Sequence, residues 1–247
     1  MQSPSLVLLS NQQALQRSMD IVANNVANAS TTGFKREGIE FDTLVSHAAQ
    51  GETTDFVVDR ATYRDASVGP IQTTGNPLDV AIQGQGYFSV RAADGTTKYT
   101  RAGSFQLDPL GQIITQSGLP VLGDGGQPIT IPDTATSINI ASDGDVTAKT
   151  DNGTSLSELG KIAVVKFGNE QALKAEGAGL YSTSQVSAPA EDSSVMEGAL
   201  EQSNVQPITE MTQMIKIMRT YEQTSNLIGQ ENTRLTDAID KLSKTSA

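Results

Sequence analysis

The C-terminal end of the chain carries a heptad pattern that limits the possible folds more than any other feature. With Met211 at an a position, two series of heptad positions can be assigned. The a positions are Met211, Met218, Ser225, Asn232 and Ile239, and the d positions are Met214, Tyr221, Ile228, Leu235 and Leu242. Five heptads span roughly 50 Å at ~1.5 Å per residue. The pattern predicts a long amphipathic helix, with Asn204 as its N-cap and Pro207 in its first turn. Such a helix packs either on its own domain or against other chains, and the sequence offers no third long helix to complete a bundle.

A second helical seam lies at the N-terminus. Its apolar residues recur at three- and four-residue intervals, with polar Gln12 filling one gap: Leu8, Leu15, Met19, Val22, Val26 and Ala29. Ser3 and Pro4 form a start signal, and Gly33 is a plausible C-terminal stop with Phe34 packing back. We predict an N-terminal assembly helix in residues 1–33 that ends in a helix-stop hinge at Gly33 and Phe34.

The signals between the two ends are those of β structure. Short alternating runs such as LDVAIQG, ITIP and KIAVVKFG are separated by turn residues. Asp94-Gly95 is the strongest hairpin signal and places YFSVR against KYTRA. The spacing predicts a central antiparallel β domain in residues 71–190, built as a sandwich or an open barrel.

The remaining segments connect these parts. Residues 34–70 include FVVDRATYRD, whose alternation predicts an extended hairpin outside the main β domain. Residues 191–247 are predicted to hold a linker and the C-terminal assembly helix. The expected fold is therefore mixed and mainly β: a central antiparallel β domain flanked by N- and C-terminal α-helices that form a coiled coil.

The composition excludes several classes of function. A net charge of −11 argues against a nucleic-acid partner, which needs clustered Lys and Arg. The absence of cysteine removes disulfides, thiolate metal sites and a Cys nucleophile. The N-terminus resembles no cleaved secretory signal, and the longest apolar runs fall far short of the ~20 residues of a membrane helix.

Candidate catalytic motifs are weak. His47 is the only histidine, whereas a triad or a zinc site needs a defined partnership. Asp143 and Asp145 flank a turn glycine without the spacing of a calcium loop. The Gly84-Gln85-Gly86 run is followed by strand-forming residues, so it offers no helix N-terminus to a phosphate. We expect no catalytic residue, cofactor, metal or small-molecule substrate.

Three asparagines stand at the end of the N-terminal helix. Asn24, Asn25 and Asn28 lie off the apolar seam and cluster on one flank. Their amides have donors and acceptors that can meet a neighbouring subunit. The alternative is that they only weaken the helix towards its end, since asparagine competes for nearby backbone groups. Both interpretations stay open at this point.

Two distant amphipathic ends suggest self-assembly. A single pair of helices would leave other apolar residues exposed, namely Leu9, Ile21, Ile215 and Ile217. Identical copies packed side by side would cover them, and repeated contacts that do not close into a ring generate a helical filament. A carbohydrate-binding β domain with helical tails is the alternative from another class. It would need aromatics on a concave face, whereas the aromatics of the middle fall at strand positions typical of a core: Tyr87, Phe88, Tyr99, Phe105 and Phe167.

Four stretches resemble bacterial flagellar axial proteins, the rod, hook and hook-associated subunits. ANNVANASTTGFKR (23–36) is similar to their N-terminal signature, and GPIQTTGNPLDVAIQGQGYFSV (69–90) to the segment that enters the β domain. YTRAGSFQLDPLGQIITQSGLPVLG (99–123) is similar to the hairpins that follow. GALEQSNVQPITEMTQMIKIMRTYEQTSNLI (198–228) is similar to the C-terminal signature helix. The four occur in the order of the family.

The resemblance implies a structural subunit without enzymatic activity. Its helices would form coiled coils in the inner tube of a helical homo-oligomer, next to other rod and axial proteins, with the β domains outside. Residues 61–79 look most like the proximal rod subunit, with distal rod and hook-type subunits as alternatives. The family also implies unfolded export by the flagellar type III apparatus, without a cleaved signal, to a rod that spans the periplasm.

Overall fold

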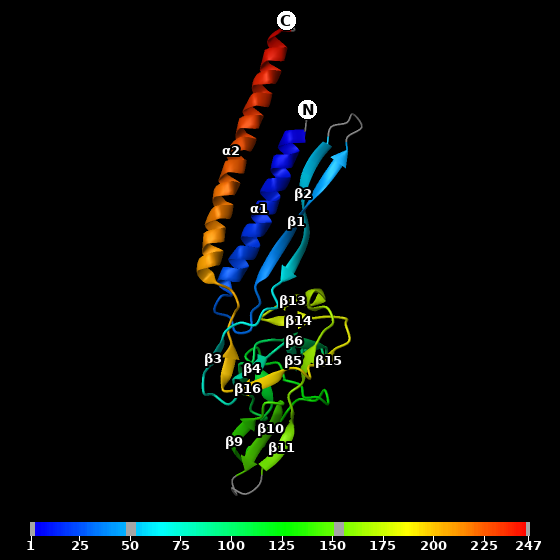
Figure 1. The fold of residues 1–247 in the computed structure, drawn as a ribbon, viewed down its shortest axis with the longest axis vertical. Helices are drawn as coiled ribbons and strands as arrows, with labels where there is room; N and C mark the ends of the chain where they lie inside the picture. Colours follow the sequence, from blue (N-terminus) through cyan, green and yellow to red (C-terminus); the bar gives the residue numbers. More distant parts are fainter. Residues whose placement is uncertain (1–2, 48–52, 151–155, 246–247) are drawn as a thin grey trace. The chain divides into compact units, whose positions relative to one another are not determined.

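The computed structural model describes residues 3–47, 53–150 and 156–245. It has a long helix at each end and strands between them (Figure 1). The elements are α1 (Ser3–Ala27), β1 (Glu37–His47), β2 (Thr53–Arg64), β3 (Ile71–Thr73), β4 (Val80–Gln83), β5 (Tyr87–Arg91), β6 (Thr97–Thr100), β7 (Phe105–Leu107), β8 (Ile113–Thr115), β9 (Ala135–Ile140), β10 (Asp145–Thr150), β11 (Leu156–Lys161), β12 (Val164–Lys166), the 3-10 turn Glu170–Ala172, β13 (Lys174–Gly177), β14 (Leu180–Ser182), β15 (Ala188–Pro189), β16 (Ser194–Glu197), β17 (Ala199–Glu201) and α2 (Pro207–Thr245). The prediction of a mainly β chain with two terminal helices is confirmed.

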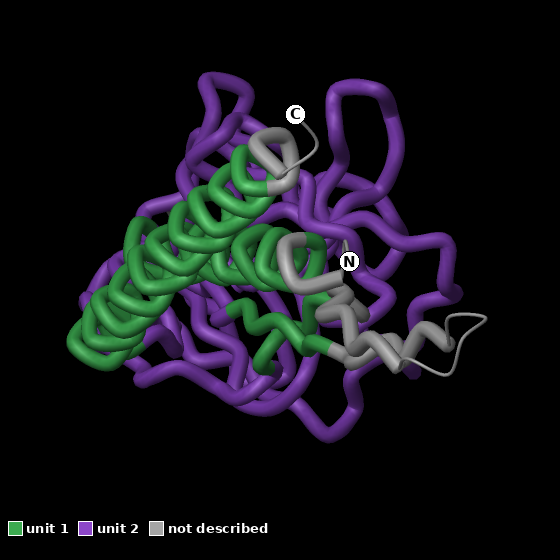
Figure 2. The backbone as a smooth tube through the Cα atoms, turned by 90° about the horizontal axis from the view of Figure 1, so that it is seen from above, with its two compact units in different colours: residues 1–27, 37–65, 206–247 green, residues 28–36, 66–205 purple. Residues whose placement is uncertain are grey.

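The chain forms two compact units (Figure 2). Unit 1 contains residues 1–27, 37–65 and 206–247, and unit 2 contains residues 28–36 and 66–205. The units regroup the predicted segments. The hairpin predicted as a linker belongs with the two helices, and residues 191–205 belong with the β domain.

Helix α1 lies between the other elements of unit 1 and contacts both α2 and the β1–β2 hairpin (Figure 1). The two helices run antiparallel, because Asn25 near the end of α1 bonds to Glu210 near the start of α2. The helices contain 25 and 39 residues. At ~1.5 Å per residue, α2 is about 20 Å longer than α1. Its C-terminal end therefore extends beyond the first turn of α1.

The β1–β2 hairpin of unit 1 occupies the region that the alternating pattern indicates. Its strands pair antiparallel from Glu37 opposite Arg64 to His47 opposite Thr53, with a register shift between Glu40 and Phe41. The side chain of His47 itself lies outside the described residues.

Unit 2 is built around a six-stranded sheet with the order β13-β14-β6-β5-β12-β15. Each neighbouring pair in this sheet is antiparallel. The turn between β5 and β6 contains the predicted Asp94-Gly95 pair, and Gly95 adopts a φ of +82° there. Smaller ladders join β9, β10 and β11, and β7 with β8.

Hydrophobic residues pack on both faces of this sheet. Alternation along β5 sends Tyr87 to one face and Phe88 to the other. Phe88 joins Phe105 and a large aliphatic cluster, while Tyr87 packs with Phe167 and Tyr181. These aromatics are buried, as the sequence predicts, and Tyr99 is half-buried with its ring centroid 4.7 Å from that of Phe167. They form core, which leaves no support among them for a carbohydrate platform.

The last strands of unit 2 pair with its first strands. β16 pairs with β4, and β17 pairs with β3, both antiparallel. The segment before α2 is therefore part of the β fold. Asn204, predicted as the N-cap of α2, lies in this segment and bonds elsewhere, whereas α2 begins at Pro207.

Candidate assembly surface

Helix α2 has a buried side and an exposed side in unit 1. Glu210, Ile217 and Thr224 are buried at seven-residue intervals. The predicted d positions next to them are half-buried: Met214, Tyr221, Ile228 and Leu235. The predicted a positions are exposed: Met211, Met218, Ser225, Asn232 and Ile239. The side of α2 that faces α1 therefore consists of the d series and of the residues that directly precede the a positions. Ile217 is buried, although the sequence predicts that it is exposed.

An apolar stripe runs along the exposed face of α2. Its members Ile208, Met211, Ile215 and Met218 follow the three- and four-residue spacing of one helix face, and they are 81, 51, 53 and 45 % exposed. A groove of about 590 Å³ beside it is lined by Leu15 of α1 and by α2 residues that include Ile208, Thr212 and Lys216. We call these four residues the α2 stripe. It is a hydrophobic surface available to another chain.

The predicted N-terminal interface residues divide in the same way. Val22 is buried, and four residues are half-buried in unit 1: Leu8, Leu15, Met19 and Val26. Leu6 and Leu9 are about half exposed, at 49 and 46 %. Asn24 is exposed and Asn28 is half-buried. The side chain of Leu242 lies outside the described residues.

Asn25 joins three elements of unit 1, a role that the sequence does not reveal. It is completely buried. Its Nδ2 donates to the carbonyl of Glu37 at 2.8 Å and to Oε2 of Glu210 at 3.1 Å, and its Oδ1 accepts from the Glu37 N–H at 2.9 Å. Because Asn25 is completely buried in unit 1, the lateral-contact proposal is kept for Asn24 and Asn28 only.

We predict that Asn25→Ala destabilises unit 1 by at least about 2 kcal/mol, because it removes three hydrogen bonds that link α1 to β1 and to the buried Glu210. Urea unfolding followed by far-UV circular dichroism measures the effect. Asn24→Ala, one residue away on the exposed side, is the control. Equal unfolding midpoints for the two variants would contradict the role of Asn25 in joining α1, β1 and α2.

Residues 28–33 form turns, so the helix stops earlier than predicted. α1 ends at Ala27, and the Thr31 and Phe34 N–H groups bond back to Asn28 and Thr31. Gly33 has a φ of +69° and donates its N–H to the Glu201 carbonyl at 2.8 Å. Gly33 is therefore a turn residue of unit 2 and not the cap of α1.

Gly33→Ala is expected to cost several kcal/mol of unit 2 stability. A Cβ at this position would lie 2.5 Å from the Arg101 carbonyl carbon and 2.6 Å from the Ala102 nitrogen, in addition to the strain of a positive φ. Gly75→Ala isolates the strain, since Gly75 has a φ of +77° and nothing lies within 4 Å of its Cβ position. Tyrosine fluorescence during urea unfolding should show a clearly larger loss at Gly33.

A buried ion cluster connects distant parts of unit 2. Lys35, Arg101 and Glu201 are 3, 4 and 1 % exposed. Glu201 Oε1 accepts from Lys35 Nζ at 2.7 Å and from the Gly69 N–H at 2.9 Å, while Oε2 accepts from Arg101 Nε at 2.5 Å. Lys35 also donates to the Ser67 carbonyl at 2.7 Å. One carboxylate thus forms ion pairs with two cations from different segments. We call these three residues the Glu201 cluster.

Burial and charge act against each other at Glu201. Burial alone would raise the pKa of its carboxyl group, but the charge of Arg101 and the hydrogen bond and charge of Lys35 lower that pKa overall. Burial lowers the pKa of Lys35 and outweighs the bond from Glu201 that raises it. The carboxylate therefore stays ionised to lower pH in the folded state than in the unfolded chain.

This lowered pKa predicts an acid dependence of stability. The contribution of Glu201 is present above its ordinary carboxyl pKa of 4.5 and is lost as the pH falls through the lower folded value. Urea midpoints from pH 7 down to about pH 3 should fall more steeply for the natural chain than for Glu201→Gln. Parallel curves would contradict the assignment, because other carboxylates are common to both proteins.

The Gly84-Gln85-Gly86 run serves Arg101. Its guanidinium donates through Nη1 to the Gly86 carbonyl and through Nη2 to the Gly84 carbonyl, both at 2.5 Å, and Nη2 also lies 3.3 Å from the Ile82 carbonyl. Gly84 and Gly86 have φ values of +109° and +137°, a backbone conformation that favours glycine. The glycines hold a cation, in agreement with the rejection of a phosphate loop.

Asn204 holds the two ends of the hairpin insertion. Its Oδ1 accepts from the Arg36 N–H at 2.7 Å, and its Nδ2 donates to the Ser67 carbonyl at 3.1 Å. The segments just before and just after the β1–β2 hairpin are therefore fastened to one side chain of unit 2.

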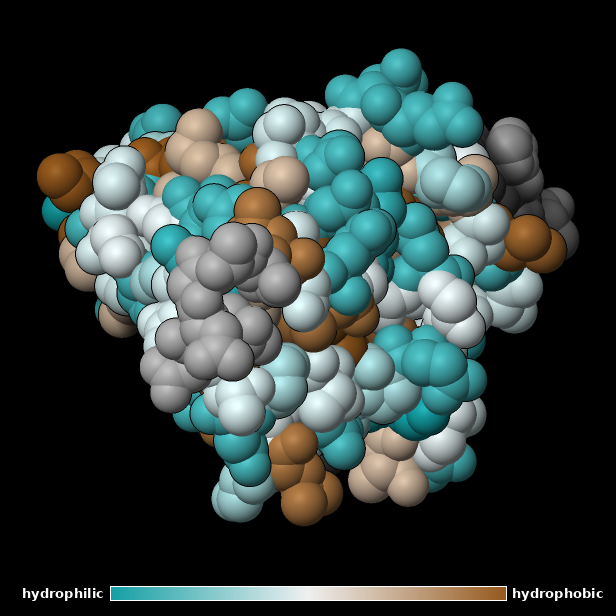
Figure 3. All heavy atoms as spheres, turned by 90° about the horizontal axis from the view of Figure 1, so that it is seen from below, coloured by the Kyte–Doolittle hydropathy of each residue, from teal (hydrophilic) through white to brown (hydrophobic). Residues whose placement is uncertain are grey.

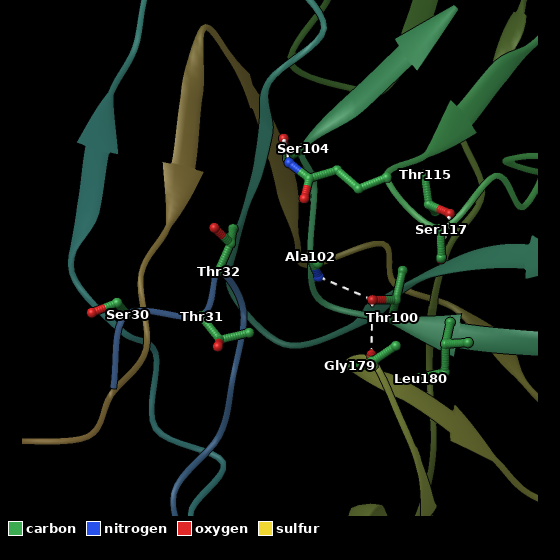
Figure 4. A pocket seen from close by; sticks show the side chains of 12 residues that line it. Ser30, Thr31, Thr32, Thr100, Ala102, Ser104, Thr115, Ser117, Gly179 and Leu180 are labelled. Atoms are coloured by element: carbon green, nitrogen blue, oxygen red, sulfur yellow. Dashed lines mark hydrogen bonds between the residues drawn. The ribbon is translucent and has the colours of Figure 1, made fainter. Parts of the chain in front are cut away.

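A cavity of about 500 Å³ lies where the signature residues Ser30–Thr32 meet the β fold (Figure 4). Seven of its twelve lining residues are serine or threonine. Thr100 Oγ1 donates to the Gly179 carbonyl and accepts from the Ala102 N–H, and Ser104 accepts from Gln116. These hydroxyls are used within the wall, which is typical of a polar seam between packed segments.

The described residues add two further findings. Among them, no group of three or more His, Asp or Glu side chains is placed to hold a metal ion, and no helix is long and apolar enough to cross a membrane. Seen from below, the surface is mostly hydrophilic or neutral, with hydrophobic residues in small separate groups (Figure 3).

Comparisons with known families match both ends and the middle of the chain. Residues 6–35 match the family described as flagella basal body rod protein. Residues 81–148 match the flagellar hook protein FlgE/F/G D1 domain, and residues 196–241 match the flagellar basal body rod FlgEFG protein C-terminal family. The three matches cover most of both helices, the first part of the β fold and its last two strands.

Individual relatives match along nearly their whole length. The chain is 37% identical to the flagellar basal-body rod protein FlgF of Caulobacter vibrioides over 96% of both chains, and 32% identical to FlgF of Mesorhizobium japonicum over 100% of both. It is 36% identical to FlgG of Agrobacterium fabrum over 90% of this chain and 92% of that one.

The chain therefore belongs to the flagellar basal-body rod protein family. Its function is structural and not enzymatic: it is a FlgF-like subunit of the basal-body rod that assembles with other flagellar axial proteins and serves motility.

Proposed function

We propose that the chain is a subunit of the proximal rod whose two terminal helices form coiled coils with neighbouring copies and other axial proteins. The α2 stripe is the observation that carries the proposal. It offers four apolar side chains on the face opposite Glu210, Ile217 and Thr224, and the last turns of α2 extend past the described part of α1. A subunit of a structural rod has a use for such a face, because each copy can cover that of the next.

The proposed interface keeps the predicted residues other than Asn25 and Val22, which are buried in unit 1. On α2 it comprises the exposed a series together with the half-buried d series. On α1 it comprises Leu8, Leu15, Met19 and Val26, with Asn24 and Asn28 as lateral contacts. Normal assembly of a chain with Asn24→Ala and Asn28→Ala would reduce these two asparagines to residues of a helix end.

Export and location belong to the same proposal. The chain passes unfolded through the flagellar type III apparatus without a cleaved signal, and it joins a rod that spans the periplasm and transmits torque to hook and filament. The resemblance of residues 61–79 to the proximal rod subunit supports the proximal level, together with the identity to FlgF. The similar identity to FlgG keeps the distal rod as the second candidate.

The absence of cysteine allows a direct test. In Ile215→Cys the introduced thiol is the only one and stands at a position whose natural side chain is 53 % exposed. It should react with a maleimide in the dilute chain and be protected in isolated basal bodies. Val186→Cys, at a 92 % exposed position of the β fold, controls for access of the reagent. Equal reactivity of the thiol introduced at Ile215 in both states would refute the interface.

A further inference from the structure

The segment that precedes α2 completes unit 2 from the far end of its sequence. Residues 194–205, here called the latch segment, supply β16 and β17 to ladders with β4 and β3. Further main-chain bonds run from Val195 to Ser142 at 2.8 Å and from Gly33 to Glu201 at 2.8 Å. Val195, Ala199 and Val205 are buried. The latch segment thus bonds to residues from both the start and the middle of the unit's sequence.

The site that receives the latch segment is positively charged. Lys35 and Arg101 are both nearly fully buried, and both form their ion pairs with Glu201 of the latch segment. Their remaining bonds go to neutral main-chain carbonyls, those of Ser67 for Lys35 and of Ile82, Gly84 and Gly86 for Arg101. Without the latch segment, two cations would have to leave water without the carboxylate that pairs with both, which is strongly unfavourable.

We propose that unit 2 is an acceptor for its own residues 194–205, closed by Glu201, so that the β fold stays open until this last segment docks. The hydrophobic side chains of the latch segment supply contact area. The carboxylate sets the condition for closure, since it is the group that makes burial of Lys35 and Arg101 possible.

The order of these residues in the sequence determines when unit 2 can close. Lys35 and Arg101 precede Glu201, so a chain that emerges with its N-terminus first presents both cations before their partner arrives. Unit 2 then closes only after nearly all of its sequence has appeared. The inference concerns the folding of one chain and is independent of the proposed assembly.

A cleavable full-length chain tests the proposal. A protease site inserted after Val186, which is 92 % exposed, separates residues 1–186 from the part that carries the latch segment. After cleavage the two parts of the natural sequence should remain associated during gel filtration. The dissociation constant between them is then measured by dilution, with the tyrosine fluorescence of the Tyr87, Tyr99 and Tyr181 cluster as the signal.

Glu201→Gln should raise this dissociation constant by a factor of about 10² to 10³, as expected when one partner of a buried ion pair is removed. Exposed Glu191→Gln is the matched control and should leave it unchanged. Glu201→Asp keeps the charge on a shorter side chain, so its dissociation constant should lie between those of the natural chain and Glu201→Gln. This variant keeps the test decisive if the glutamine variant folds poorly. Separation of the natural halves on cleavage, or equal constants for the Asp and Gln variants, would overturn the proposal.

Discussion

A chain with Met211, Ile215 and Met218 all replaced by serine is expected to fold normally and to be missing from the rod. These members of the α2 stripe are about half exposed in the single chain. Burying the remaining half of each is worth roughly 1 kcal/mol, so their loss removes about 3 kcal/mol from each contact and weakens association more than hundredfold. A rod repeats this contact in each copy, so loss of swimming should be complete.

The measurement uses a strain without its own copy of the protein. Swimming in soft agar and the amount of variant in purified basal bodies report assembly, and circular dichroism of the purified chain reports folding. Three exposed amide residues of the same helix, Gln223, Asn226 and Gln230, replaced together by serine form the control for helix propensity. The presence of the triple stripe variant in basal bodies at the natural level would rule out the stripe as an essential contact.

The second large effect is expected in the Glu201 cluster. Glu201→Gln leaves Lys35 and Arg101 buried without the carboxylate that pairs with both, and it should lower the free energy of unfolding of unit 2 by about 3–5 kcal/mol. Lys35→Met should cost less, because the remaining Glu201 and Arg101 form a neutral pair. The double variant Lys35→Met with Glu201→Gln should then be less destabilised than the sum of the two single changes.

Urea unfolding followed by tyrosine fluorescence measures this cycle, since three tyrosines belong to unit 2 near its sheet: Tyr87, Tyr99 and Tyr181. Glu191→Gln provides the reference for an exposed carboxylate. Strictly additive effects would mean that Lys35 and Glu201 are energetically independent, contrary to their 2.7 Å contact.

Local patterns in the sequence predict the elements well. Heptad spacing identifies both helices, and alternation with Asp94-Gly95 identifies the β5–β6 hairpin, because these signals depend on neighbours in the chain. The face of α2 is harder to assign. Glu210 and Thr224 look like solvent residues in the sequence, yet they are buried, and the a-position residues one place later are exposed.

The polar junctions have no local signal. Asn25 and Glu210 are 185 residues apart, and Arg101 and Glu201 are 100 apart. A helix-weakening asparagine and a charged residue next to a turn look the same in sequence whether they are solvated or buried. The run Phe34-Lys35-Arg36 is recognisable in the sequence as part of a signature. That Lys35 is buried can be inferred only from the structure, which places Glu201 beside it.

The position of Asn204 has a consequence for how such chains vary. Because Arg36 and Ser67 bond to the same side chain, this side chain of unit 2 holds the entry and exit of the β1–β2 hairpin together. We therefore expect that a shorter or longer hairpin between residues 36 and 66 would leave the strand pairing of the β fold unchanged. For the same reason, we expect length differences among related subunits to fall between these two points.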